Sequence, residues 1–341
     1  VVLMRSEVTA AVLEDRLRPR IRDTARVLWT IYASLFVANA IALALAGLPA
    51  FDAVCHALTT VSTGGFSTSD LSFAGFSPAA QWICIAFMFL GATSFLLHGK
   101  AVSGDLLAYA KSEEFRAYVL ILLVSTLLVT AVVMATAGPV VESPVPSLAP
   151  ETHDEAAFGT ALRDAAFQVT SIMTSTGFAS ADYDAWPDAA RFLLIVLMLV
   201  GSCSGSTAGG LKVFRVLLVI RTIGRQLRLL LSPARVVNVR YGDATVPRDT
   251  LLAASTLMLL ALFLVVLGAL ALTLMGLGLA ESLSGAISCL TCVGPAFGEL
   301  GPTGNYADVP ALGKVVLSAL MLMGRLEVYA VLVLFAMIGR K

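Results

Sequence analysis

Apolar residues along this chain gather in runs that follow a repeated order of long, short and long. The runs lie at about 26–48, 51–62 and 79–99, then at about 115–137, 157–175 and 189–209, and finally at about 249–277, 281–292 and 310–338. A helix of roughly 20 apolar residues crosses the hydrocarbon core of a bilayer, whereas a shorter apolar helix is more typical of a re-entrant segment. The pattern therefore predicts an all-α membrane protein built from repeated units. Each unit is a transmembrane helix, a re-entrant helix with its loop, and a returning transmembrane helix.

Composition favours a membrane protein over the alternative of a large soluble helical bundle. Of the 341 residues, 58% are hydrophobic and 13% are charged, whereas about 25% of the residues of a soluble domain are charged. Cys289 and Cys292 form a CxxC pair, but no second pair and no neighbouring His completes a zinc site in the sequence. We therefore expect these cysteines to pack as small residues of a short helix, and we expect no cofactor in this chain.

Basic residues lie largely on one side of the predicted membrane. Four segments hold 19 of the 23 Lys and Arg residues, at positions 5–26, 100–116, 212–248 and 340–341. Acidic segments alternate with them, at positions 52–70, 142–188 and 281–308. Because positively charged loops stay in the cytoplasm, the chain is predicted to cross the membrane six times with both ends in the cytoplasm. The short runs and the segments that follow them then lie toward the outer side.

The segment after each short run is rich in Thr, Ser and Gly. These segments read TVSTGGFS at 60–67, TSTGFAS at 174–180 and TCVGPAFG at 291–298. Aligning Gly64 with Gly177 and Gly294 places the repeats 113 and 117 residues apart, which is far longer than the period of a solenoid. One such segment would fit a simple turn that caps a helix. Three in register, each between two spanning runs, indicate a shared function.

A cation pore accounts for these segments. An ion that sheds its water needs a cage of oxygens, and backbone carbonyls supply one where glycine permits positive φ. Irregular backbone at membrane depth is tolerated where it lines a water-filled cavity. We therefore predict a central pore with an ion-binding filter formed by Thr63, Gly64, Gly65, Thr176, Gly177, Phe178, Val293 and Gly294. The predicted potassium ligands are the backbone carbonyl oxygens of Thr63, Gly64, Thr176, Gly177, Val293 and Gly294.

Acidic residues follow the predicted filter segments closely. They are Asp70, Asp182, Asp184, Glu299 and Asp308. Each one alone is better explained as an ordinary surface acid, but together they would concentrate cations at the outer mouth.

The second return run contains a glycine-rich interruption at residues 201–210. Four glycines in ten residues disfavour a helix interior by about 1 kcal/mol each relative to Ala, and discontinuous helices mark binding regions in transporters. We predict an intramembrane gate formed by Ser202, Gly205, Ser206, Thr207, Gly209 and Gly210. Two enzyme interpretations compete, a nucleophile elbow at 201–205 and a phosphate-binding loop at 205–212. No strand is predicted before the first, and Leu211 occupies the lysine position of the second, so we predict that the protein is not an enzyme.

Arg325 lies within the last apolar run, where an ionised side chain needs a wet cavity or a partner. We assign it to the predicted gate, projecting into the pore beneath the filter as an electrostatic barrier or as an anchor for residues 201–210. The alternative is that it extends to the cytoplasmic surface. Glu327 is two residues away and faces another side of the helix, which disfavours a pair within the helix. The basic residues that follow the glycine-rich interruption would contact either anionic lipid or a cytosolic partner.

These residues together resemble the Trk/Ktr/HKT superfamily of potassium transporters, and in particular its bacterial TrkH-like branch. The matching stretches span nearly the whole chain, at 19–20, 28–32, 63–70, 176–178, 186–187, 205–212 and 324–328. The resemblance implies four helix–pore–helix units around one pore, with one filter glycine per unit, here Gly64, Gly177 and Gly294. It also implies that residues 202–210 form the gate and that Arg325 lies below the filter.

The resemblance also implies a domain organisation and partners. Residues 1–24 would be a cytoplasmic linker, 25–111 the second unit, 112–240 the third unit with the broken gate helix, and 241–341 the fourth. The first unit is expected before Val1. The implied assembly is a homodimer in the bacterial cytoplasmic (inner) membrane, in contact with lipid and with a cytosolic nucleotide-binding RCK-type (TrkA-like) regulatory subunit, and not with nucleic acid. The predicted function is potassium uptake, and the alternative is a secondary transporter of sodium or another small solute.

Overall fold

The computed structural model describes residues 21–136, 155–232, 237–242, 244–329 and 331. The predicted linker at 1–24, the basic residues at 340–341 and the end of the last apolar run therefore lie wholly or mostly outside the described residues. Helices make up most of the described chain, and the predicted all-α class is confirmed. The described strands are β1 (Arg240–Tyr241) and β2 (Ala244–Thr245), a short antiparallel hairpin that pairs Arg240 with Thr245.

Counted along this chain, the first unit is the one expected to be second in the family. It begins with α2 (Ile21–Leu45), followed by the short helix α3 (Ala50–Val61). Its return segment is α4 (Pro78–Gly91), which starts with Pro78 in its first turn and with the Ser77 hydroxyl accepting from the Ala80 N–H. Such an N-cap satisfies a backbone donor that the helix itself leaves unpaired. After a bend of 93° the chain continues as α5 (Phe95–Val102) and α6 (Leu107–Lys111).

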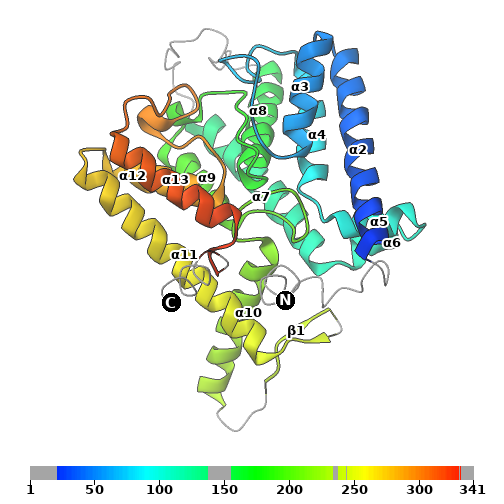
Figure 1. Cartoon of the computed structure of the whole chain (residues 1–341), viewed down its shortest axis with the longest axis vertical. Coiled ribbons are helices and arrows are strands. Elements are labelled where there is room, and N and C mark those ends of the chain that lie inside the picture. Colours follow the sequence, from blue (N-terminus) through cyan, green and yellow to red (C-terminus); the bar gives the residue numbers. More distant parts are fainter. Residues whose placement is uncertain (1–20, 137–154, 233–236, 243, 330, 332–341) are drawn as a thin grey trace.

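The second and third units repeat this order. The second contains α7 (Glu113–Thr136), the short helix α8 (Glu155–Met173), the 3-10 turn η2 (Tyr183–Ala185), α9 (Asp188–Val200) and α10 (Val213–Leu231). The third contains α11 (Arg248–Leu274), the short helix α12 (Leu279–Thr291), the 3-10 turn η3 (Gly298–Leu300) and α13 (Ala311–Arg325). In Figure 1, α10 and the first part of α11 lie side by side toward one end of the molecule, and the hairpin lies beside them.

The expectation of six crossings stays a prediction. Within the described residues, three helices are long and apolar enough to span a membrane, in α2, α7 and α11, or four segments if α4 and α5 count as one bent span. The return helices α4, α9 and α13 are shorter, and each is interrupted at its inner end. The third interruption follows Arg325, where Glu327 adopts a φ of 55°. Apolar content alone hides these breaks, because the residues beyond them are also apolar.

The short helices α8 and α12 lie largely inside the molecule, whereas the short helix α3 exposes Phe51, Val54 and Leu58. Every residue of α12 from Ser284 to Thr291 is buried, whereas α11 carries exposed large apolar side chains such as Phe263 and Val266. The core packs α7, α8 and α9 against α11, α12 and α13, and a second cluster joins α2, α3 and α4 to Phe167 of α8. An apolar exterior around the buried helices α8 and α12 is the arrangement expected of a protein solvated by lipid.

Candidate functional site

Each short helix ends in a turn with the same backbone conformation. We call residues 62–67, 174–179 and 291–296 the first, second and third glycine turns. Each turn opens with a non-glycine residue in the left-handed region, and two residues later a glycine also has positive φ. The non-glycine residues and their φ values are Thr63 (52°), Ser175 (52°) and Cys292 (59°). The glycines are Gly65 (68°), Gly177 (82°) and Gly294 (110°). Positive φ at the second position is inexpensive because glycine lacks a Cβ.

The hydrogen bonds behind the turns repeat as well. A hydroxyl on each short helix donates to the carbonyl seven residues later, from Thr59 to Phe66 (2.8 Å), from Ser171 to Phe178 (2.7 Å) and from Ser288 to Pro295 (2.9 Å). The backbone carbonyls of the hydroxyl-bearing residues also accept hydrogen bonds. Thr59 accepts from the N–H of Gly64 (2.7 Å), Ser171 from that of Thr176 (2.9 Å) and Ser288 from that of Val293 (2.9 Å). The three turns are therefore repeats at the level of single hydrogen bonds.

This equivalence corrects the alignment made from the sequence. Gly65, not Gly64, corresponds to Gly177 and Gly294, and Gly64 corresponds to Thr176 and Val293. The repeats are thus 112 and 117 residues apart, from the differences between positions 65, 177 and 294. The first turn contains two consecutive glycines, and the sequence alone does not show which of them takes positive φ.

The three glycine turns meet one another. A Cβ added at Gly65 would overlap the carbonyl oxygen of Thr176, and one at Gly177 would overlap the carbonyl oxygen of Val293. At Gly294 the corresponding space is open. The first turn thus packs against the second, and the second against the third. In each case the carbonyl of the later turn, on Thr176 or Val293, lies against the glycine of the earlier one.

Hydrogen bonds also join the segments that follow the turns. The N–H of Phe73 donates to the carbonyl of Ala179 (2.8 Å), and the hydroxyl of Tyr183 donates to the carbonyl of Ala296 (3.1 Å). The side chain of Phe178 is buried against Phe73 and His56, so it packs into the hydrophobic core beside the second glycine turn. Its carbonyl accepts from the Ser171 hydroxyl. Phe178 is thus placed to support the turn and not to face its centre.

Most carbonyl oxygens of the turns are not used within the protein. Among the described residues, no hydrogen bond is donated to the carbonyls of Thr63, Gly64, Gly65, Ser175, Thr176, Gly177, Cys292 or Val293. These include five of the six carbonyls predicted as potassium ligands. The sixth, on Gly294, accepts from the hydroxyl of Tyr306 at 2.7 Å. Since buried carbonyls normally have partners, an unpaired set at one place is chemically suited to a cation.

The interruption after α9, which we call the Gly-rich loop (residues 201–212), lies against the inner ends of all three short helices. The Thr207 hydroxyl donates to the carbonyl of Val61, the last residue of α3 (2.9 Å). The N–H of Gly209 donates to the Ser175 hydroxyl just after α8, and the N–H of Gly210 donates to the carbonyl of Thr291, the last residue of α12 (3.1 Å). The loop therefore covers the inner side of the glycine turns.

Close packing at Gly209 explains why glycine is needed in this loop. A Cβ there would overlap the carbonyl oxygen of Thr291. The other predicted gate residues lie in the same loop: Ser202 is buried with its hydroxyl 3.3 Å from that of Ser206, and the carbonyl of Gly205 accepts from the N–H of Phe95 (3.0 Å). The structure thus places the predicted gate residues of this loop at one site. They are Ser202, Gly205, Ser206, Thr207, Gly209 and Gly210.

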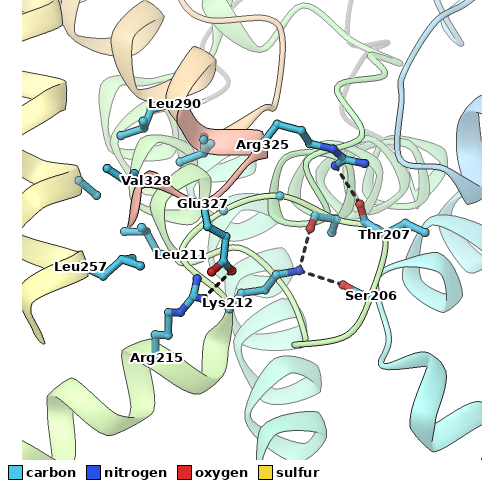
Figure 2. Close-up of a pocket in the computed structure, with 16 residues that line it drawn as sticks. Ser206, Thr207, Leu211, Lys212, Arg215, Leu257, Leu290, Arg325, Glu327 and Val328 are labelled. Atoms are coloured by element: carbon cyan, nitrogen blue, oxygen red, sulfur yellow. Dashed lines mark hydrogen bonds and ion pairs between the residues drawn. The ribbon is translucent and has the colours of Figure 1, made fainter. Parts of the chain in front are cut away.

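Two charged residues that the sequence analysis did not assign to the site also hold this loop. The buried carboxylate of Glu114, in the first turn of α7, accepts from the N–H groups of Ser204 (2.7 Å) and Phe214 (3.1 Å) at the two ends of the loop. The ammonium of Lys212 donates to the carbonyl of Ala208 (2.7 Å) and to the hydroxyl of Ser206 (3.5 Å), and Figure 2 shows Lys212 pointing toward Ser206. An acid in the first turn of an otherwise apolar helix was the one available sequence signal for Glu114.

Arg325 lies at the end of α13 and reaches the Gly-rich loop. Its guanidinium donates to the carbonyl of Thr207 at 3.2 Å, and the two residues face each other in Figure 2. Glu327 pairs with Arg215 of α10, not with Arg325. These residues line a cavity of about 220 Å³ next to the loop. Of the two positions considered for Arg325, the contact with the loop is the one observed.

The outer acids are not equivalent. Asp70, Glu299 and Asp308 are exposed, whereas Asp184 pairs with Arg191 at 2.8 Å. Burial raises the pKa of the Asp182 carboxyl, and the Asp184 N–H that donates to it partly offsets this shift. At least three of the five acids thus present charge to solvent beyond the turns.

Comparisons with known proteins agree with this architecture. A family model for TrkH, described as a cation transport protein, matches residues 1–340. The chain is 37% identical to Trk system potassium uptake protein TrkH of Halomonas elongata, and 34% identical to the protein of that name in Salmonella typhimurium. Each alignment covers 98% of this chain and 66% of the relative, so the chain spans slightly less than two thirds of the length of these relatives.

A solved structure shows the same fold. The crystal structure of the potassium transporter TrkH from Vibrio parahaemolyticus superposes with a TM-score of 0.84 at 32% sequence identity, over 96% of this chain and 68% of that one. The likeness therefore extends across nearly all of the chain. Sequence and fold lead to one assignment: this chain belongs to the TrkH family of cation transport proteins.

Proposed function

We propose that the protein takes up potassium across the bacterial cytoplasmic membrane, with the three glycine turns as its selectivity filter. The observation that carries the proposal is the set of unpaired carbonyl oxygens at Gly64, Thr176 and Val293, on turns that pack against one another. Carbonyl oxygens at fixed positions replace the hydration shell of potassium in known filters. The names of the relatives, which are potassium uptake proteins, support the same ion.

The short helices would assist at the inner side of the filter. Helices α3, α8 and α12 all end next to the Gly-rich loop, through Val61, Ser175 and Thr291. The C-terminal end of a helix carries a partial negative charge, so three such ends together favour a cation at this depth. The open side of Gly294 is where a further turn would complete a fourfold ring, in keeping with the predicted units at 25–111, 112–240 and 241–341.

The Gly-rich loop is proposed as the gate. It lies across the inner ends of the short helices, and Arg325 places a positive charge beside it. A cation that leaves the filter toward the cytoplasm must pass this loop and this charge. The loop is held by side chains that can release it without unfolding a helix, which suits a segment that opens and closes.

The basic residues support the proposed orientation and a contact on the cytoplasmic side. Helix α10 lies beside the first part of α11 toward one end of the molecule, and it carries Arg221, Arg225 and Arg228. The positive-inside rule places this end in the cytoplasm. There it is proposed to meet anionic lipid and a cytosolic nucleotide-binding RCK-type subunit, in a homodimer of the transporter. Motion of α10 would then reach the Gly-rich loop directly, because the loop ends where α10 begins.

Ion uptake tests the proposed function. We expect the full-length protein in lipid vesicles to take up radioactive rubidium, a potassium substitute, with potassium competing at least about tenfold better than sodium for a filter of matched carbonyls. The vesicles without protein are the control for leakage. Equal competition by sodium and potassium would contradict potassium selectivity, and no protein-dependent uptake would contradict transport by this protein.

A further inference from the structure

One carbonyl of the glycine turns differs from its counterparts. The carbonyl oxygen of Gly294 accepts a hydrogen bond from the Tyr306 hydroxyl at 2.7 Å. Among the described residues, the equivalent carbonyls of Gly65 and Gly177 accept none. The third turn also differs at its glycine N–H, which donates to the Ser288 hydroxyl, whereas the N–H groups of Gly65 and Gly177 donate to the carbonyls of Thr59 and Ser171.

Apart from the bond from Tyr306, the peptide group after Gly294 is restrained by the ring of Pro295, which fixes its own φ and limits the conformations of Gly294. Its nitrogen belongs to Pro295, which has no N–H to donate. Gly294 itself has a φ of 110° and open space where a side chain would be, so its backbone is free of steric restraint on that side. The hydrogen bond from Tyr306 is therefore the one hydrogen bond that this peptide group makes among the described residues.

The groups on either side of this peptide are anchored from the short helix. The Ser288 hydroxyl accepts from the N–H of Gly294 (3.0 Å) and donates to the carbonyl of Pro295 (2.9 Å). Tyr306 approaches from the segment between η3 and α13, where it is half-buried and packs against the core around α12. Ser288 and Tyr306 together bind three consecutive polar groups of the turn, which are the N–H of Gly294, the carbonyl of Gly294 and the carbonyl of Pro295.

We propose that Tyr306 is a selectivity-determining positioning residue, whose hydroxyl holds the Gly294 carbonyl in a fixed direction in the third turn. This inference rests on the proposed role of the glycine turns as a potassium filter. A fixed carbonyl cannot move inward to coordinate a smaller ion. A carbonyl released from Tyr306 can rotate at Gly294 and approach sodium, whose radius is smaller than that of potassium, so that discrimination between the two ions falls.

The test compares Tyr306→Phe with Tyr183→Phe in the full-length protein, reconstituted in lipid vesicles. Both changes remove one hydroxyl that donates to a carbonyl of the third turn, at Gly294 in the first case and at Ala296 in the second. Uptake of radioactive rubidium and of radioactive sodium is measured in the same preparations. The ratio of the two rates does not depend on how much protein is active, so partial loss of folded protein does not obscure the result.

We expect Tyr306→Phe to lower the rubidium-to-sodium ratio about fivefold, the change in an equilibrium constant that the loss of one hydrogen bond produces. Tyr183→Phe should keep the wild-type ratio. A wild-type ratio in Tyr306→Phe, or an equal fall in both variants, would overturn the role of Tyr306 and leave the proposed function intact. Wild-type protein that does not distinguish the two ions would instead overturn the potassium filter, and this inference with it.

Discussion

Gly177→Ser is expected to reduce rubidium uptake by about 10- to 100-fold, because a side chain at this position costs roughly 1–3 kcal/mol in backbone strain alone. Gly177 has a φ of 82°, which residues with a Cβ rarely adopt. A Cβ there would also overlap the carbonyl oxygen of Val293. The second and third turns would have to separate to admit the side chain, and the carbonyls proposed as ion ligands would move with them. The initial rate of rubidium uptake into vesicles measures the effect.

Gly75→Ala is the matched control for this substitution. Gly75 lies in the segment after the first turn, and a Cβ there would meet nothing within 4 Å. We expect uptake by Gly75→Ala to equal that of the wild type. Rubidium uptake by Gly177→Ser at the wild-type rate and with wild-type selectivity would mean that the turns are ordinary helix caps.

Arg325→Gln is expected to raise the rate of rubidium uptake about five- to tenfold, since a unit charge near a passing cation is worth roughly 1 kcal/mol or more where water penetrates. The substitution removes the positive charge beside the Gly-rich loop. It also weakens the hydrogen bond to the carbonyl of Thr207, so the loop is held less firmly in its observed position. Both effects act in the same direction, and the initial uptake rate reports their sum.

Two further variants separate these effects. Arg325→Lys keeps the charge but loses the planar guanidinium, so a rate between those of the wild type and Arg325→Gln is expected. Lys111→Gln removes an exposed basic residue at the end of α6, outside the glycine turns, the Gly-rich loop and α10, and should not change the rate. A rate for Arg325→Gln at or below that of the wild type would contradict the assignment of Arg325 to the ion path.

The positions of the helices and the family could be predicted from this sequence, because both depend on long local patterns. The three long helices, the three short helices and the break after Val200 all lie where apolar runs and glycines indicated. The contact between Arg325 and the Gly-rich loop was one of two predicted positions. These features follow from hydropathy, from the cost of glycine in a helix and from the cost of charge in a membrane.

Features that depend on contacts between distant segments could not be predicted in this way. The choice of Gly65 over Gly64 depends on how the first turn packs against Thr176. The bonds from Ser204 and Phe214 to Glu114 join residues that are 90 and 100 positions apart. Tyr306 lies 12 residues after the carbonyl that it holds, and no local pattern relates the two.

The location of the bound ion tests the central claim most directly. Crystals of the full-length protein grown in rubidium give an anomalous signal that marks each rubidium ion. We predict a peak between the glycine turns, within coordinating distance of the carbonyl oxygens of Thr176 and Val293. A map with no peak there, or with rubidium only in the cavity beside Arg325 and Glu327, would contradict the assignment of the turns as the filter.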